Sequence, residues 1–299
     1  MILLGVPASF RVQGGKQPSR YSGRILPVPV GKNTLTDELA ASVAALPRTS
    51  LDAMEAVQLM RRFDTKYVLP ESWLPDLFAT MAPHAHVLEV AGHVECRYDN
   101  LYFELPGEQF LQDHLRGKAR RMKVRSRTYG SNGLTFLEVK ERIPGGRTEK
   151  QRTACPGGVA SSLTEPQSKF LKDHVDRARE LEARLNGAFL RTTLVDFDRH
   201  ERVTIDRSLE AGLVDQDMEP LLEGLAVIEI KQPRPDRYTP LQKWLRNLAN
   251  RKGAIGRSTR MSKYTMARLD RDPDIAGRAY LATYRRLQDA QSWAGDLQA

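Results

Sequence analysis

The stretch from Arg121 to Tyr129 places a cation at every second position through Arg127 and constrains the fold more than any other part of the chain. Side chains of a β-strand point alternately to its two faces, so this pattern predicts a strand with one basic and one apolar face. The basic face would carry Arg121, Lys123, Arg125, Arg127 and Tyr129. Like charges two residues apart repel each other. The basic face therefore either points into water or surrounds a polyanion.

The same alternation recurs in four other stretches, where charged residues share a face opposite apolar or neutral ones. The charged sets are Glu138, Lys140 and Arg142; Lys150 and Arg152; Glu229 and Lys231; and Asp64 and Lys66. Half-solvated strands with outward charges are one interpretation of this pattern. A sheet that turns the charges inward is the other, and its buried cations would require an anion of several charges.

The periodicity and the turn residues predict an α+β fold with an antiparallel, barrel-like sheet. We expect helices over residues 36–46, 51–60, 71–81, 165–185, 239–251 and 272–293. Strands are expected over residues 62–69, 86–90, 94–103, 121–129, 135–143, 148–152, 192–199, 202–206 and 226–232. Residues 1–34 are rich in Gly, Pro, Ser and Arg and predict a disordered leader, followed by a single domain over residues 35–299.

The charge balance favours an anionic partner, because 46 Lys and Arg against 37 Asp and Glu give a net charge of +9. Few aromatic residues accompany the basic ones, so base stacking, and with it a nucleic-acid partner, is not expected. Cys96 and Cys155 have no metal-site spacing, which suits a reducing compartment. We expect neither a signal peptide nor a membrane span, and predict a cytoplasmic protein.

An ordered series of motifs resembles the vacuolar transporter chaperone (VTC) domain, the polyphosphate polymerase branch of the triphosphate tunnel metalloenzymes and part of the CYTH-like superfamily. The resemblance covers about residues 50–267. Its motifs are Arg62-x-Asp64-x-Lys66-Tyr67, residues 98–103, His114-x-x-Gly117, the basic strand 121–129, Leu137-Glu138-x-Lys140, residues 202–206, residues 228–231 and Ser262-Lys263-Tyr264. Each motif is weak alone, but the ordered series is specific.

The resemblance implies an antiparallel β-tunnel, closed as a barrel of about eight strands, that binds polyphosphate. It implies transfer of the γ-phosphoryl group of ATP to a polyphosphate chain, with Mn²⁺ or Mg²⁺ as cofactor. The catalytic residues would be Lys66, Arg125, Arg127, Lys140, Arg199 and Lys263. The substrate-binding residues would be Lys123, Tyr129, Lys150, Arg202, Lys231, Arg260 and Ser262. The metal ligands would be Glu229 and Glu138.

The chain departs from the family pattern at two places. Phe197-Asp198-Arg199 stands where a Tyr-x-Arg strand end is usual, and Glu104 replaces an Asp. Two other functions stay open: hydrolysis of triphosphates in the same kind of tunnel, and polyphosphate binding without catalysis. A membrane protein is a further expected partner, and the sequence leaves the oligomeric state open.

Overall fold

The computed structural model describes residues 37–55, 63–144, 148–156, 158, 163–252, 256–272, 275 and 278–296. The predicted leader, residues 1–34, lies outside these ranges. The assignment of residues 35–299 to a single domain stays a prediction.

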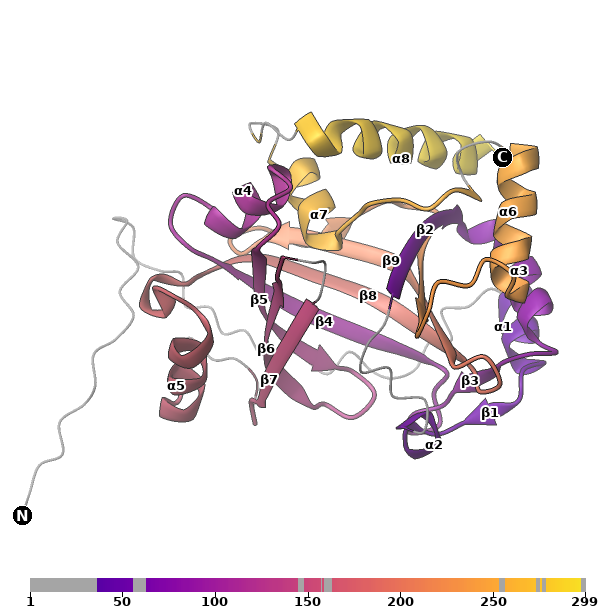
Figure 1. Cartoon of the computed structure of the whole chain (residues 1–299), viewed down its shortest axis with the longest axis horizontal. Coiled ribbons are helices and arrows are strands. Elements are labelled where there is room, and N and C mark those ends of the chain that lie inside the picture. Colours follow the sequence, from indigo (N-terminus) through magenta and orange to yellow (C-terminus); the bar gives the residue numbers. More distant parts are fainter. Residues whose placement is uncertain are drawn as a thin grey trace, which may run out of the picture.

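The described strands form one eleven-stranded sheet (Figure 1). Its main path is antiparallel throughout and runs in the order β2 (Phe63–Pro70), β11 (Leu225–Gln232), β9 (Glu201–Leu213), β8 (Glu182–Asp196), β4 (Glu95–Glu104), β5 (Arg121–Tyr129), β6 (Thr135–Arg142) and β7 (Thr148–Ala154). Three short strands flank this path. β1 (Arg48–Thr49) pairs in parallel with β3 (His86–Leu88), which pairs with β8, and β10 (Glu219–Pro220) pairs with β9.

The prediction of a closed barrel is wrong. β2 and β7 lie at the two ends of the strand path, and they do not pair with each other in the described part of the chain. A loop bridges the two halves of the sheet instead. The backbone N–H of Thr259 donates to Lys66 O of β2 at 2.7 Å. Three residues on, Ser262 Oγ accepts a hydrogen bond from Lys123 Nζ of β5 at 2.5 Å. The loop thus connects β2 to β5 by hydrogen bonds across the gap that strand pairing would close in a barrel.

Helices cover the apolar outer face of the sheet at the β2 end. Ile228, Ile230, Val203 and Ile205 pack there with α1 (Asp37–Ala44), α3 (Leu74–Met81) and α6 (Pro240–Lys252). The short helices η1 (Glu71–Trp73) and α2 (Leu51–Glu55) precede α3 and β2. Burying each large aliphatic side chain contributes about 1.5–3 kcal/mol, so this cluster fixes which face of β9 and β11 turns outward.

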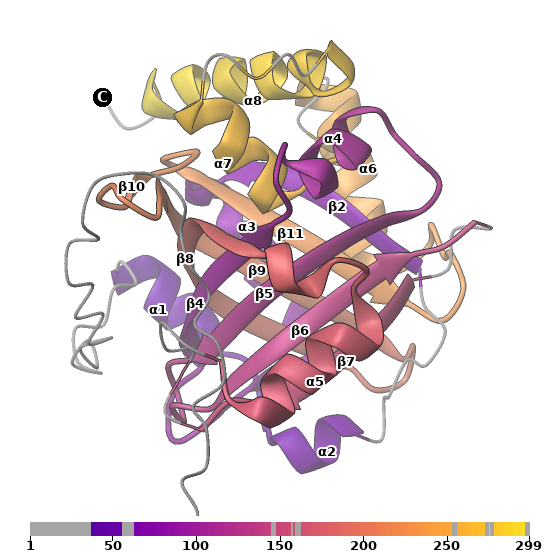
Figure 2. The ribbon, with the colours of Figure 1, turned by 90° about the vertical axis from the view of Figure 1, so that its left-hand side faces the viewer.

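The other half of the sheet is covered in the same way. Val124, Leu137 and Val139 form a second buried cluster with Leu171 of α5 (Glu165–His174), and Figure 2 shows α5 in front of β6 and β7. A third cluster joins α4 (Gln109–Leu115), α7 (Lys263–Arg271) and α8 (Arg278–Asp296) to apolar residues of β8, β9 and β11. The charged side chains on the alternate positions are therefore turned away from the helical cover at α5 and α6.

The predicted helix over residues 165–185 is wrong beyond residue 174. α5 ends there, a short helix η2 (Ala178–Glu180) follows, and β8 begins at Glu182. Arg177 takes a left-handed backbone conformation with φ 61°, which interrupts the helical path. β4 and β9 then pair with this segment on both sides, so tertiary pairing overrides its helical propensity. The sequence also predicted no helix at α4 or α7. No helix in the described part of the chain has the length and apolar character that a membrane crossing requires.

Candidate functional site: a cation-lined inner face

The inner face is the side of the sheet that carries Lys66, Lys123, Lys140, Glu229 and their neighbours in register. Residues directly opposite each other on paired strands point to the same face, and Lys66 lies opposite Glu229 while Lys123 lies opposite Lys140. Curling of the sheet brings its two halves together. Burial lowers the pKa of Lys140 on β6. Charges of the far strands also shift this pKa: Glu229 and Asp64 raise it, and Lys66 lowers it. The charges thus converge, as the inward interpretation predicted.

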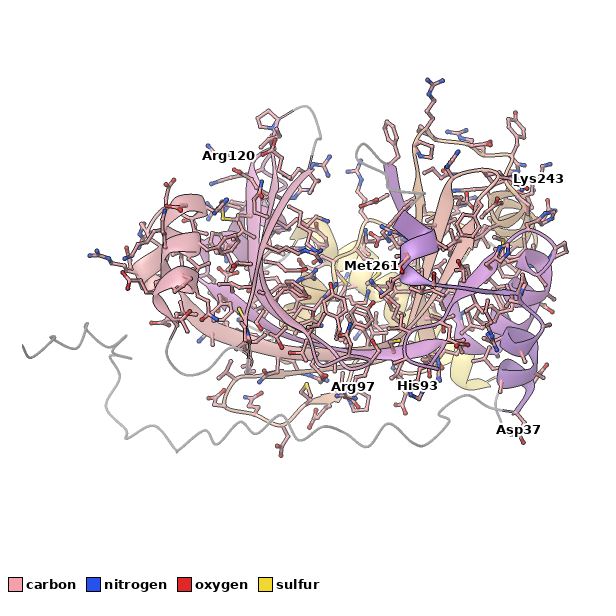
Figure 3. The ribbon with its side chains drawn as sticks, turned by 90° about the horizontal axis from the view of Figure 1, so that it is seen from below. Asp37, His93, Arg97, Arg120, Lys243 and Met261 are labelled. Atoms are coloured by element: carbon pink, nitrogen blue, oxygen red, sulfur yellow. The ribbon has the colours of Figure 1, made fainter. Side chains whose placement is uncertain are left out.

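Figure 3 shows the two halves of the sheet from below, with Met261 between them and Arg97 on the opposite, outer side. Met261 precedes Ser262 and is buried, so the start of α7 lies within the curl. The outer side has charges of its own. Arg97 pairs there with Asp99 at 2.9 Å and with Glu210 at 3.0 Å. Basic side chains therefore occur on both faces, and on the outer face Arg97 is matched by two carboxylates.

Glu229 of β11 is held between two lysines. Lys66 Nζ of β2 contacts Glu229 Oε1, and Lys231 Nζ donates to Glu229 Oε2 at 2.5 Å and to Thr204 Oγ1 at 3.2 Å. Burial alone would raise the pKa of Glu229, but the Lys231 and Lys66 ammonium groups lower it well below its usual range. Burial lowers the pKa of Lys231 to about 8, against the pull of Glu229. Glu229 is therefore a carboxylate at neutral pH.

Glu138 of β6 anchors the other half of the inner face and is 1% exposed. Arg125 donates to its Oε2 through Nε at 2.8 Å and Nη2 at 2.7 Å, while Lys150 Nζ of β7 contacts Oε1 at 2.5 Å. Burial would raise the pKa of Glu138, but Arg125, Arg127 and Lys150 lower it to about 2. The carboxylate fixes the direction of both cations across three strands.

A third carboxylate, Asp206 of β9, was not among the predicted site residues. Arg191 of β8 holds it by a two-pronged contact, Nε to Oδ1 at 2.5 Å and Nη2 to Oδ2 at 2.7 Å. Lys263 of α7 reaches the same Oδ2 at 2.5 Å. The Arg191 guanidinium lies 4.8 Å from the ring centroid of Tyr98, close enough for a cation–π interaction. This cluster links the sheet to the first residue of α7.

The prediction missed Arg191 because it placed residues 165–185 in a helix and began the next strand at residue 192. The sequence did carry a signal. Phe189-Leu190-Arg191 has the same aromatic-x-Arg pattern as Phe197-Asp198-Arg199, and Phe189 also lies on the inner face, 5.1 Å from the Arg191 guanidinium. Arg199 itself lies in the β8–β9 turn, with a side chain 40% exposed, and pairs with Asp196 at 2.9 Å. The structure therefore brings Arg191, not Arg199, to the cluster.

Several inner-face cations have no carboxylate partner. Lys140 forms no hydrogen bond or ion pair with any residue that the structure describes. Among the described residues Lys123 donates only to Ser262 Oγ, and burial together with the charge of Lys140 lowers the pKa of Lys123 well below the usual range. Arg127 Nε donates to Asn100 Oδ1 at 2.8 Å, and burial, with Arg125 nearby, lowers its pKa to about 10. No carboxylate among the described residues lies within ion-pair distance of these three side chains, so an added anion could contact them.

The remaining predicted residues lie near this face. Arg202 is opposite Lys231 in register, and its Nη1 lies 3.9 Å from Met54 Sδ. Tyr129 packs edge-on against Tyr98, with ring centroids 5.0 Å apart. Ser262 caps α7 by accepting from Thr265 N at 3.3 Å. Arg260 is exposed in the loop before α7.

The acidic residues do not form an all-protein metal cage. The described residues contain no group of three or more His, Cys, Asp or Glu side chains that could hold a metal ion. Glu229 is a single carboxylate, and Mg²⁺ is commonly bound by one or two carboxylates together with substrate phosphates. The donor set therefore fits a metal that arrives with phosphate oxygens, and Glu138, nearly unexposed, is the less accessible of the two predicted ligands.

The fold and the inner face define an α+β protein with an open, curled antiparallel sheet lined by cations. A family model described as the VTC domain matches residues 61–269, more than half of the chain, so the chain belongs to the VTC domain family. The resemblance seen in the sequence is thereby confirmed. No curated protein matches the sequence.

Three solved structures are similar to the chain. HpAC1 from Hippeastrum, an adenylyl cyclase candidate with a dominant triphosphatase activity, is 14% identical, with TM-score 0.42, and the match covers 71% of this chain and 97% of that one. An adenylate cyclase candidate from Bacillus halodurans is 11% identical, with TM-score 0.39, over 67% and 92%. One from Vibrio parahaemolyticus is 13% identical, with TM-score 0.39, over 70% and 98%.

Proposed function

We propose that the protein is a metal-dependent phosphotransferase that moves the γ-phosphoryl group of ATP onto the end of a polyphosphate chain lying on the inner face. The terminal oxygen of the acceptor forms the new P–O bond, and the bond between the γ-phosphorus and the bridging oxygen of ADP breaks. The VTC domain family match and the convergence of charges on one face support this proposal.

The excess of cations over carboxylates among the buried and half-buried side chains of the inner face is the observation that carries the proposal. Asp206, Glu138 and Glu229 are each held by two cations, and Lys123, Lys140 and Arg127 lack a carboxylate contact. Cations removed from water are costly unless an anion neutralises them, so the face is suited to a ligand with many negative charges. A linear polyphosphate carries its charges in a row, as the cations do.

The residues around the reacting phosphates would act by position and charge. Arg125 and Arg191 have planar guanidinium groups that are already oriented by Glu138 and Asp206, and such groups bind phosphate oxygens in pairs. Lys66, Lys231 and Lys263 add point charges. Loose phosphoryl-transfer transition states need alignment and charge neutralisation more than covalent chemistry. No protein nucleophile is required.

A divalent cation, Mn²⁺ or Mg²⁺, would be held by Glu229 with the phosphates themselves, and Glu138 is the second predicted ligand. When bound, it would neutralise negative charge that develops on the phosphates during transfer. Lys66 and Lys231 already keep Glu229 ionised, so the carboxylate is in the form that a metal needs. The sequence also predicted a membrane protein as a partner that takes up the product, and this stays a prediction.

The test is incubation of the purified protein with ATP and Mn²⁺ or Mg²⁺, followed by separation of polyphosphate, ADP and inorganic phosphate. We expect polyphosphate and ADP from the native protein and none from Glu229→Gln, whereas Glu210→Gln on the outer face should keep activity. Inorganic phosphate alone would establish the hydrolase. Binding of polyphosphate without turnover in either metal would establish a binding module, and both results overturn the proposal.

A further inference from the structure

The wall formed by β5, β6 and β7 carries its inner-face charges in cross-strand rows. Arg125 lies opposite Glu138, and this row contains a carboxylate. The next row towards the start of β5 pairs Lys123 with Lys140, and the last pairs Arg121 with Arg142. Like charges directly opposite each other destabilise a sheet. Two successive rows without a carboxylate therefore mark a stretch built for an anion.

Arg260 joins the last row from outside the sheet. Its loop is held at the neighbouring Thr259, whose N–H donates to Lys66 O of β2 at 2.7 Å and whose Oγ1 accepts from Arg286 Nη2 of α8 at 2.6 Å. The position of Arg260 is thus set by β2 and α8. Burial lowers the pKa of Arg121, and the charges of Arg142 and Arg260 lower it further, so Arg121 is repelled by both guanidinium groups.

The three arginines have few partners of their own. Arg142 and Arg260 are exposed and make no hydrogen bond or ion pair with a residue that the structure describes. Within the described ranges, the Arg121 side chain donates only to Lys118 O, at 2.9 Å. In Figure 3, the neighbouring Arg120 lies at the end of the β5–β6 pair, which places this row at the rim of the inner face.

The rim lies well beyond the carboxylates. Antiparallel strands rise about 3.4 Å per residue, so four residues separate Arg121 from Arg125 by about 14 Å. The row of Lys123 and Lys140 lies between them and makes the cationic path continuous. A ligand of three phosphates held at the carboxylate clusters would occupy the inner rows, whereas a long chain would continue to the rim.

We propose that Arg121, Arg142 and Arg260 form a rim site that binds the distal phosphates of a long polyphosphate chain and makes affinity depend on chain length. This inference rests on the proposed function insofar as polyphosphate is the ligand. In this proposal the rim binds the part of the polyphosphate chain that does not take part in phosphoryl transfer.

The experiment measures Kd for tripolyphosphate and for long-chain polyphosphate, without metal, for the native protein and for Arg121→Ala/Arg142→Ala, the two members of the last row of the wall. The control is Arg116→Ala/Arg120→Ala, which removes the same charge from exposed positions, Arg120 being paired with Glu141 and 72% exposed. We expect the rim variant to weaken long-chain binding on the order of tenfold and to leave tripolyphosphate within about twofold. Its slope of log Kd against log salt for the long chain should fall by about two.

Equal losses for both ligands, or losses no larger than those of the control, would overturn the rim site. If the native protein binds tripolyphosphate but gains nothing from a longer chain, the rim site fails and the proposed function survives. If the native protein binds neither ligand, both fail. Arg142 is exposed and Arg121 is only half-buried, so the variants are expected to fold, and thermal unfolding of each variant checks this.

Discussion

Arg191 of β8 donates two hydrogen bonds, of 2.5 and 2.7 Å, to Asp206 of β9 on the inner face of the sheet. The two residues lie directly opposite each other in register, so the contact reinforces the pairing of the two longest strands. Lys263 joins the same carboxylate from α7. One buried carboxylate thus ties the sheet, the helix and two candidate phosphate ligands together.

Removing the Asp206 charge should destabilise the protein strongly. The Asp206 side chain is 1% exposed, against 26% for Asp99 on the outer face. Asp206→Asn leaves the half-buried Arg191 and Lys263 without their counter-charge, and breaking a buried ion pair costs about 3–5 kcal/mol. Chemical denaturation measures the free energy of unfolding. Asp99→Asn, which removes an outer-face partner of the partly exposed Arg97, should cost less than about 1 kcal/mol. Similar losses in both variants would show that the inner-face cluster is not specially buried.

The sequence predicted that Arg199 binds phosphate, whereas the structure places Arg191 on the inner face, and substitutions of the two arginines distinguish these assignments. Arg191→Lys keeps a charge but loses the planar fork, and we expect tripolyphosphate to bind about 10- to 100-fold more weakly. Arg199→Lys, in the exposed turn, should leave Kd within about twofold. Titration calorimetry measures both. Weakened binding in Arg199→Lys with native binding in Arg191→Lys would return the role to Arg199.

Glu104 should make stability depend on pH. The Glu104 carboxyl group accepts hydrogen bonds from the N–H groups of Phe110 and Leu111 and from Tyr264, which lower its pKa. Burial has the larger effect and raises the pKa of Glu104 from 4.5 to about 7. As pH rises from 4.5 to 7, the unfolded chain releases the proton and the folded protein keeps it. Stability relative to Glu104→Gln should therefore fall by about 3 kcal/mol and level off above pH 7.

Denaturation of both proteins between pH 4 and 8 measures this difference. Burial also raises the pKa of Glu201 to about 7, but Glu201 is present in both proteins, so its contribution cancels. Parallel stability profiles for native protein and Glu104→Gln would contradict the assignment.

Binding of tripolyphosphate should weaken above pH 8. Burial lowers the pKa of Lys231 to about 8, so its positive charge is lost as pH rises from 7 to 9, and with it an attraction for the anion. Lys231→Arg keeps its charge throughout this range. The ratio of the two Kd values cancels the ionisation of the ligand itself. A ratio that does not change from pH 7 to 9 would show that Lys231 does not face the ligand.

The strands with strict alternation were predictable from sequence. The range predicted for the basic strand, residues 121–129, is that of β5, and residues 135–143 and 226–232 match β6 and β11 within one residue. The inward charges of Lys66, Glu229 and Lys140 also followed from alternation once the resemblance favoured one face. α7 was missed because its buried residues include Thr265 and Arg268, which weaken its apolar periodicity.

The sequence by itself determined which side chains share a strand face, because backbone geometry alternates them whatever lies around the strand. Only the tertiary structure decided that the path stays open between β2 and β7, that the loop before α7 bridges the gap, and that Arg191 rather than Arg199 joins the inner face. These features depend on contacts between residues far apart in the chain, and local periodicity carries no information about them.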